Sequence, residues 1–446
     1  MMHYVLGVHR LPIRSPAYCQ HMSTFGFHPL AATSMTALGL IGISNFYHDF
    51  SFKREALRWY SKALQMTNAA LASPAEAKSD TTLFATMLLS VFEATSNERS
   101  LIAWSNHIAG SESLIRMRGT KQFTSPSGRR MFKQVVSLAT MNYMGMGKKV
   151  PDYILAMNKE IQKYEKYDDP ANRFYHLHID VVNFRAEVKQ GDITDLRLII
   201  ERALELDKVA KTIFECQGPD WDYIVVQDGE NNPSVFSNIY HIYPHMASAL
   251  VWNWVRYNRI YIHDIIRNCL LTGFSMNPPV FFEARYTSLL QECQETLYQM
   301  QHDIIASIPQ HLFDTPKSFS ADLLRSDLQS TSPSIKFLWS NFSKQDVLIQ
   351  PLEHDFSEDQ IPVVRTSGGH SSLWALYVAG STPIATPESQ QFIITSLSRV
   401  SSEFGIHQAK ILGNALKLKI HLDNTGQQPF ELVPSYLPER GEHFED

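Results

Sequence analysis

Apolar side chains recur at spacings of three and four residues through most of the chain, and no other feature constrains its fold as strongly. In residues 56–71 this spacing places the apolar positions on one face of a helix. Alternating, strand-like runs are scarce, and DYIVVQ at 222–227 and VLIQPL at 347–352 are the only short candidates. The sequence therefore predicts an all-α fold, built as a large multi-helix array.

Capping residues divide this pattern into separate helices. Asp169 followed by Pro170 predicts the start of a long helix, and Gly191 predicts its end. Pro244 interrupts a later apolar stretch, so a new helix is expected after it. Further helix starts are expected at Ser73, Asp80, Pro151 and Thr194, and helices return at 371–380, 387–405 and 406–422.

One domain is expected to span residues 1–421. Residues from about 310 to 366 lose the helical spacing and become polar, which predicts an irregular surface excursion. Residues 422–446 are rich in Pro, Gln and acidic side chains, and we expect a disordered acidic tail there. Residues 1–48 hold no acidic side chain, as in a transit peptide, but MTALGLIGISNF at 35–46 favours a buried amphipathic start.

Composition excludes several classes of protein. The chain has 446 residues, and 40 Lys and Arg against 45 Asp and Glu give a net charge of -5, so no overall positive field attracts DNA or acidic membranes. No run of about 18 uninterrupted apolar residues predicts a membrane span. The four cysteines are widely separated and contain no CxxC pair, which favours reduced thiols in a soluble intracellular protein.

The segment WSNHIAGSESLIRMRG at 104–119 concentrates polar side chains that resemble an active site. However, it contains neither the G-x-S-x-G of a hydrolase elbow nor the H-E-x-x-H of a metalloprotease. Helical spacing instead places Trp104, Ile108 and Ile115 on one buried stripe, with Gly119 ending the helix in a left-handed conformation. We therefore interpret His107 as a half-buried packing residue that forms a hydrogen bond.

Two histidine pairs also suggest ligand sites. His176 and His178 alternate as on a strand, but in a helix they point apart. His241 and His245 have ligand spacing, but a two-histidine site without a third ligand carries little weight. Ser367-Gly-Gly-His370 resembles a phosphate or oxyanion loop, although a flexible lead-in to a helix at Ser371 explains it more simply. Arg129, Arg130 and Lys133 could touch phosphate, but a solvated helix face is the simpler interpretation. No catalytic, cofactor, metal or DNA-binding residue is assigned.

The pattern W-x-x-H-I-x-G-x-x-x-L-I-x-x-R-G at 104–119 resembles the signature segment in the regulatory region of fungal-specific transcription factors, the binuclear zinc-cluster regulators. Several other segments resemble the same region in the same order, and ordered matches are more specific than any single one. These segments are 56–64, 79–93, 128–132, 252–266, 373–380 and 405–410.

The resemblance implies a nuclear or nucleocytoplasmic transcription regulator, not an enzyme and without a cofactor. It implies contacts with protein partners of the transcription machinery or with a DNA-binding partner, and it allows a small-molecule effector and a homodimer. The family's DNA-binding module holds zinc with six clustered cysteines, whereas Cys19, Cys216, Cys269 and Cys293 lie far apart. We therefore expect effector sensing, partner recruitment or dimerisation without the chain's own zinc-cluster module.

The alternative is a small-molecule-binding protein or an enzyme that reuses the helical scaffold, since a fold does not fix function. Trp252, Trp254, Tyr257 and His263 could line its pocket, although such a stripe is more often core. Perturbed acids and bases gathered in one cleft would favour an enzyme.

The cysteine spacing and the charge generate a first prediction. We expect the purified 446-residue chain to hold no stoichiometric zinc, by elemental analysis, and to show no sequence-specific DNA binding at physiological salt. A gel shift with nanomolar, sequence-selective affinity would contradict it.

Overall fold

The computed structural model describes residues 28–313 and 363–425, apart from 167, 216, 219, 220, 229–231, 244 and 245. Within these residues the chain is all-α with one two-stranded sheet, as the helical spacing predicted. Most of the expected excursion near 310–366 and most of the expected tail at 422–446 lie outside the described residues. The ends of the excursion that are described are helical, because α13 (Pro309–Leu312) precedes the gap and α17 (Val363–Ser381) follows it.

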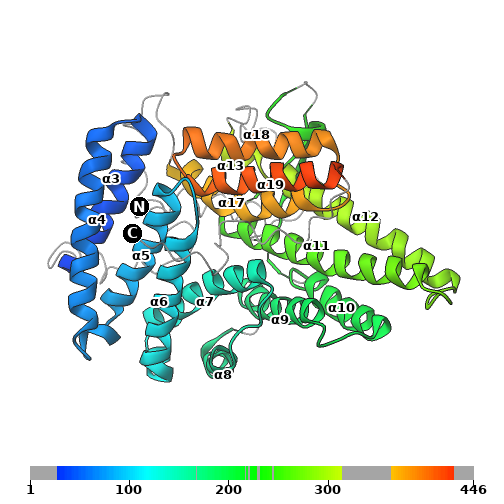
Figure 1. Ribbon diagram of the computed structural model, residues 1–446, viewed down its shortest axis with the longest axis horizontal. Helices are drawn as coiled ribbons and strands as arrows, with labels where there is room; N and C mark the ends of the chain where they lie inside the picture. Colours follow the sequence, from blue (N-terminus) through cyan, green and yellow to red (C-terminus); the bar gives the residue numbers. More distant parts are fainter. Residues whose placement is uncertain are drawn as a thin grey trace, which may run out of the picture.

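The N-terminal helices form one end of the molecule (Figure 1). α3 packs against both α4 and α5, and α5 packs against α6. The outer helix α4 buries little more than Ala56, Ala63 and Thr67, whereas α5 is buried over much of its surface. The elements are α3 (Pro29–Tyr47), α4 (Phe50–Leu71), η1 (Glu76–Lys78), α5 (Asp80–Ser96), α6 (Ile102–Arg118), η2 (Gly119–Thr124) and α7 (Pro126–Met146).

The middle of the molecule is organised by α11 (Met246–Ser275), a helix of 30 residues that contacts α9, α10, α12 and α17. Both large apolar clusters of the protein include residues of α11, so this helix joins them. The surrounding elements are α8 (Asp152–Ile161), η3 (Gln162–Tyr164), α9 (Pro170–Gln190), α10 (Leu196–Lys211), η5 (Phe236–Asn238) and α12 (Ala284–Ala306).

The small sheet pairs β1 (Ile224–Gln227) antiparallel with β2 (Ile239–Ile242), with Val225 opposite His241. The run at 222–227 was expected as a strand candidate, and this expectation is confirmed. Its partner IYHI was not expected. The other candidate, VLIQPL at 347–352, lies outside the described residues.

The C-terminal helices α17, α18 (Pro387–Glu403) and α19 (Gln408–Asn424) pack on one another, and α17 also packs on α11 and α12. Figure 1 shows these orange and red helices lying along the green central helices. The side chain of Ile411 in α19 joins an apolar cluster with Trp104 and Ile108 of α6. The last described helix therefore contributes to the core of the N-terminal part.

Two of the expected helix starts are wrong by one residue. α5 is capped by Ser79, whose hydroxyl accepts from the Thr82 backbone N–H at 3.1 Å, while Asp80 is the first helical residue. α10 is capped by Asp195 and not Thr194, because the Asp195 carboxylate accepts from the N–H groups of the next turn. In each case the residue with extended backbone at the junction is the cap, which spacing alone does not reveal.

α3 is the described helix whose length and composition would allow it to cross a membrane. Half of its apolar window is buried inside the protein, however, against α4 and α5. Such burial is typical of a core helix.

The packing of α6 generates a stability prediction. Trp104→Ala should lower the free energy of unfolding by about 3–5 kcal/mol, because it removes a large side chain from the cluster that joins α6, α7 and α19. Met117→Ala, at an exposed position of the same helix, should change it by less than about 0.5 kcal/mol. Chemical denaturation measures both, and equal effects would show that Trp104 does not hold these helices together.

Candidate functional site

The segment at 104–119 forms α6, and its buried stripe is confirmed. Trp104, Ile108 and Ile115 are all buried, and the Ser111 hydroxyl donates to Thr86 Oγ1 of α5 at 3.0 Å. Gly119 ends the helix at a φ of 59° but a ψ of -161°, so it leads into η2 and is not the left-handed cap that we expected. The polar side chains of this segment contact neighbouring helices: Ser111 and Arg118 contact α5, and Glu112 accepts from the Tyr143 hydroxyl of α7.

His107 is half-buried and contacts α4. Its Nε2 lies 3.0 Å from the Tyr60 hydroxyl, which donates to Glu93 Oε1 at 2.5 Å. Burial lowers the pKa of His107, and burial with the Glu93 hydrogen bond raises the pKa of Tyr60. Tyr60 therefore keeps its proton, and the His107 imidazole is neutral near pH 7. The half-buried, hydrogen-bonded position predicted for His107 is confirmed.

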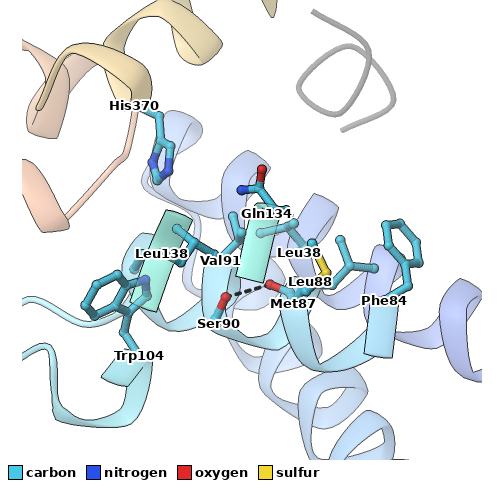
Figure 2. A pocket seen from close by; sticks show the side chains of 11 residues that line it. Leu38, Phe84, Met87, Leu88, Ser90, Val91, Trp104, Gln134, Leu138 and His370 are labelled. Carbon is cyan, nitrogen blue, oxygen red and sulfur yellow. Dashed lines mark hydrogen bonds between the residues drawn. The ribbon is translucent and has the colours of Figure 1, made fainter. Parts of the chain in front are cut away.

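A small cavity of about 60 Å³ lies where the N-terminal helices meet α17. Figure 2 shows Leu38, Met87, Val91 and Leu138 around it, with His370 reaching from α17 toward Leu138. Its lining is mostly apolar, and burial lowers the pKa of His370 to about 4, so this imidazole is neutral near pH 7. The volume suits one or two waters and not a larger effector.

Next to this cavity, side chains far apart in sequence connect α3 and α5 to the C-terminal helices. The Asn45 amide of α3 donates to the carbonyls of Thr95 and Gly405, at 2.9 and 2.7 Å. Gly405 has a φ of 66°, and a Cβ there would lie 2.5 Å from Asn45 Cβ, so both backbone and space require glycine. On the surface, Lys410 Nζ lies 2.6 Å from Glu98 Oε2. We call this junction the terminal seam.

The expectation for Ser367–His370 is wrong. These residues lie inside α17 and form neither a loop nor a flexible lead-in. A Cβ at Gly368 would lie 2.9 Å from His311 Cβ, and one at Gly369 would lie 2.9 Å from the Phe404 ring. The two glycines therefore allow close packing of α17, and the backbone N–H groups of a helix interior are not free to bind an anion.

The basic group on α7 is not a solvated face, contrary to expectation. Arg129 Nη1 donates to the Phe123 carbonyl at 2.6 Å, and Lys133 pairs with Glu165. Arg129, Arg130 and Lys133 are all partly buried. Arg129 and Lys133 have intramolecular partners that compete with any phosphate.

The described histidines of the two pairs contact different neighbours. His176 contacts Glu165 at 2.8 Å and His178 contacts Asn258 at 3.0 Å, so they point to different neighbours as expected for a helix. His241 Nδ1 lies 3.1 Å from the Tyr243 hydroxyl, and His245 lies outside the described residues. As far as the structure describes the chain, no three His, Cys, Asp or Glu side chains are placed to hold a metal ion.

The four residues of α11 that could line a pocket, Trp252, Trp254, Tyr257 and His263, lie in different surroundings. Tyr257 is buried in the core, Trp254 packs against it, and His263 Nε2 lies 3.1 Å from Asp207 Oδ1. Trp252 lines a cavity between α10, α11 and α12, together with Arg256 of the same helix. Arg256 carries no signal in the sequence, because a single arginine on a helix predicts a solvated side chain.

Residues 21–144 match the family described as the fungal specific transcription factor domain. The match includes α3 to α6 and nearly all of α7, with the signature segment in α6. The resemblance found in the sequence is confirmed for this part of the chain, which is similar to the fungal specific transcription factor domain, whereas the segments at 252–266, 373–380 and 405–410 lie outside the match. No curated protein and no solved structure gives a significant match to the chain.

The buried histidines generate a pH prediction. Burial lowers the pKa of His178, His311 and His370 to about 4 and, with Arg256, that of His241 to about 3. Between about pH 6.5 and 4 the unfolded chain therefore binds protons that the folded chain does not, and stability falls as pH falls. Each such histidine contributes about 1.4 kcal/mol per pH unit below its unfolded pKa.

Urea denaturation at pH 7.0, 6.0 and 5.0 measures this dependence. His178→Asn should reduce the slope, whereas His421→Asn, at an exposed position, should leave it unchanged. Stability that is constant over this range would show that these imidazoles accept protons in the folded protein.

Proposed function

We propose that this chain is a nuclear transcription regulator that acts through its helical domain by binding protein partners. The observation that carries the proposal is the family match at residues 21–144, which form the packed N-terminal helices. The net charge of -5 also favours protein contacts over direct contacts with DNA.

The turn between α3 and α4 provides a surface for such a partner. Tyr47 and Phe50 are 63% and 83% exposed, and aromatic side chains are enriched in protein interfaces. His48 has a left-handed φ of 53°, and the Asp49 side chain accepts from the Ser51 N–H at 2.7 Å. These contacts fix the backbone of the turn, from which both rings project into solvent.

The charge around the turn indicates the chemistry of the partner. Arg54 is exposed one helical turn after Phe50, and Arg58, one turn further, is exposed and pairs with Glu55 at 3.2 Å. An apolar surface with an unneutralised arginine near its edge is complementary to an acidic segment with apolar side chains. The proposed occupant is therefore an acidic, amphipathic segment of a protein of the transcription machinery or of a DNA-binding partner.

A tethering assay tests the proposal. The full chain, fused to an unrelated DNA-binding domain, should change the output of a reporter in a fungal cell relative to that DNA-binding domain alone. Phe50→Ser should weaken partner binding about tenfold or more, because burial of a Phe side chain contributes about 1.5–3 kcal/mol. The change in reporter output should then shrink accordingly.

Phe282→Ser is the matched control, because Phe282 is 79% exposed and lies just before α12, in a different part of the chain. Its fusion should behave as the unmodified chain does. A fusion that leaves the reporter unchanged would argue against a regulatory role. Equal effects of the two variants would instead show that the partner does not bind at the α3–α4 turn.

A further inference from the structure

A buried arginine borders a cavity between three helices. Arg256 of α11 is 1% exposed, and beside it a cavity of about 120 Å³ lies between α10, α11 and α12. Lys211, Arg259 and Asp303 also line this cavity. Burying a charged group is unfavourable unless it is paired or hydrogen-bonded, so the contacts of Arg256 indicate what the cavity can hold.

One edge of the Arg256 guanidinium is satisfied by the protein. Nη1 donates to the Tyr243 hydroxyl at 2.5 Å and to Asn253 Oδ1 at 3.0 Å. The rings of Tyr223 and Trp252 lie 5.1 and 5.2 Å from the guanidinium carbon, within the range of cation–π interaction. These groups orient the side chain rigidly.

The other edge has no hydrogen-bond partner among the described residues, because Nε and Nη2 are both buried and unpaired. The nearest carboxylate oxygen, Asp303 Oδ2, lies 3.7 Å from Nε, which is too far for a hydrogen bond. Asp303 lines the cavity, so this edge faces it. Nε–H and Nη2–H on one edge form the fork that binds a carboxylate with two parallel hydrogen bonds.

The side chains around the cavity carry an excess of one positive charge, which a bound anion would neutralise. Asp207 accepts from Arg259 Nε at 2.6 Å and lies 2.9 Å from Lys211 Nζ, so it neutralises these two cations only in part. Counting Arg256 and Asp303, three cations face two carboxylates. Burial and the charge of Arg256 hold the nearby His241 neutral by lowering its pKa, so it adds no charge near pH 7.

The remaining lining limits the size and shape of the ligand. Phe214, Val255 and Met300 make part of the wall apolar. An apolar cavity of about 150 Å³ holds benzene, so 120 Å³ suits roughly five or six non-hydrogen atoms. Lys211 borders the cavity and its side chain is 58% exposed, which provides a route from solvent.

We infer that this cavity binds a small monocarboxylate, with its carboxylate on the Nε and Nη2 edge of Arg256 and its short apolar chain against Phe214, Val255 and Met300. The inference goes beyond the proposed function and does not depend on it, because binding is measured with the purified chain.

Calorimetric titration of the full chain with sodium butyrate tests the inference. Butyrate has six non-hydrogen atoms, and we expect a Kd of about 0.1–1 mM for a ligand of this size. Butyramide has the same shape without the charge and should bind at least about tenfold more weakly. No detectable binding of butyrate at 10 mM, or equal binding of butyramide, would overturn the assignment.

Variants locate the site. Arg256→Met removes the guanidinium and should lose butyrate binding; circular dichroism checks its folding, because the change leaves Asp303 without its nearby cation. Asp303→Asn should bind butyrate several-fold more tightly, because it removes the like charge nearest to the ligand. Arg285→Met, at an exposed arginine, should bind as the unmodified chain does.

If Arg256→Met fails to fold, Asp303→Asn still decides the question. Unchanged or weaker binding of butyrate by this variant would show that the ligand does not share Arg256 with Asp303. Full retention of binding by a folded Arg256→Met variant would overturn the inference directly.

Discussion

The fold depends on a helix that is buried on several sides while carrying polar residues. α11 contacts four other helices, and Asn253, Asn258 and His263 are all buried in it. Each of these side chains finds a partner on another element: Ser307 for Asn253, His178 for Asn258, and Asp207 for His263. Because an unpaired buried polar group is costly, these pairs fix the register in which α9, α10 and the end of α12 pack against α11.

Asp207 of α10 is the buried carboxylate of this network. Burial alone would raise the pKa of its carboxyl, but contacts with His263 and Arg259 outweigh that effect and hold the pKa well below its usual range. The carboxylate therefore stays charged and keeps α10 against α11. The same attraction holds Arg259 at the wall of the larger cavity, so the packing of the core and the charge of that cavity have one origin.

The sequence predicted the helices and the buried face of α6, but not the helix caps or the long-range contacts. Apolar spacing identified the helices, and the stripe of Trp104, Ile108 and Ile115 predicted the buried face of α6, because side-chain spacing on a helix is local information. The caps at Ser79 and Asp195 were each missed by one residue, since a cap depends on the backbone conformation at the junction. The glycines of α17 were misread because their reason lies in contacts with His311 and Phe404, more than 30 residues away for Phe404 and more than 50 for His311. Arg256 could not be recognised at all, since only the packing of β2, α10 and α12 around α11 removes it from water.

The terminal seam changes how the family match should be understood. The matched segment ends within α7, yet the apolar cluster of Trp104 is completed by Ile411, and a single amide, that of Asn45, joins backbone carbonyls 310 positions apart, at 95 and 405. A sequence family marks what is retained through divergence, whereas a cooperative folding unit is defined by shared burial, and here the two do not coincide. The helices of the matched region thus share buried contacts with α19 and with Gly405, both outside it, so the ends of the family match are not the boundaries of a packing unit.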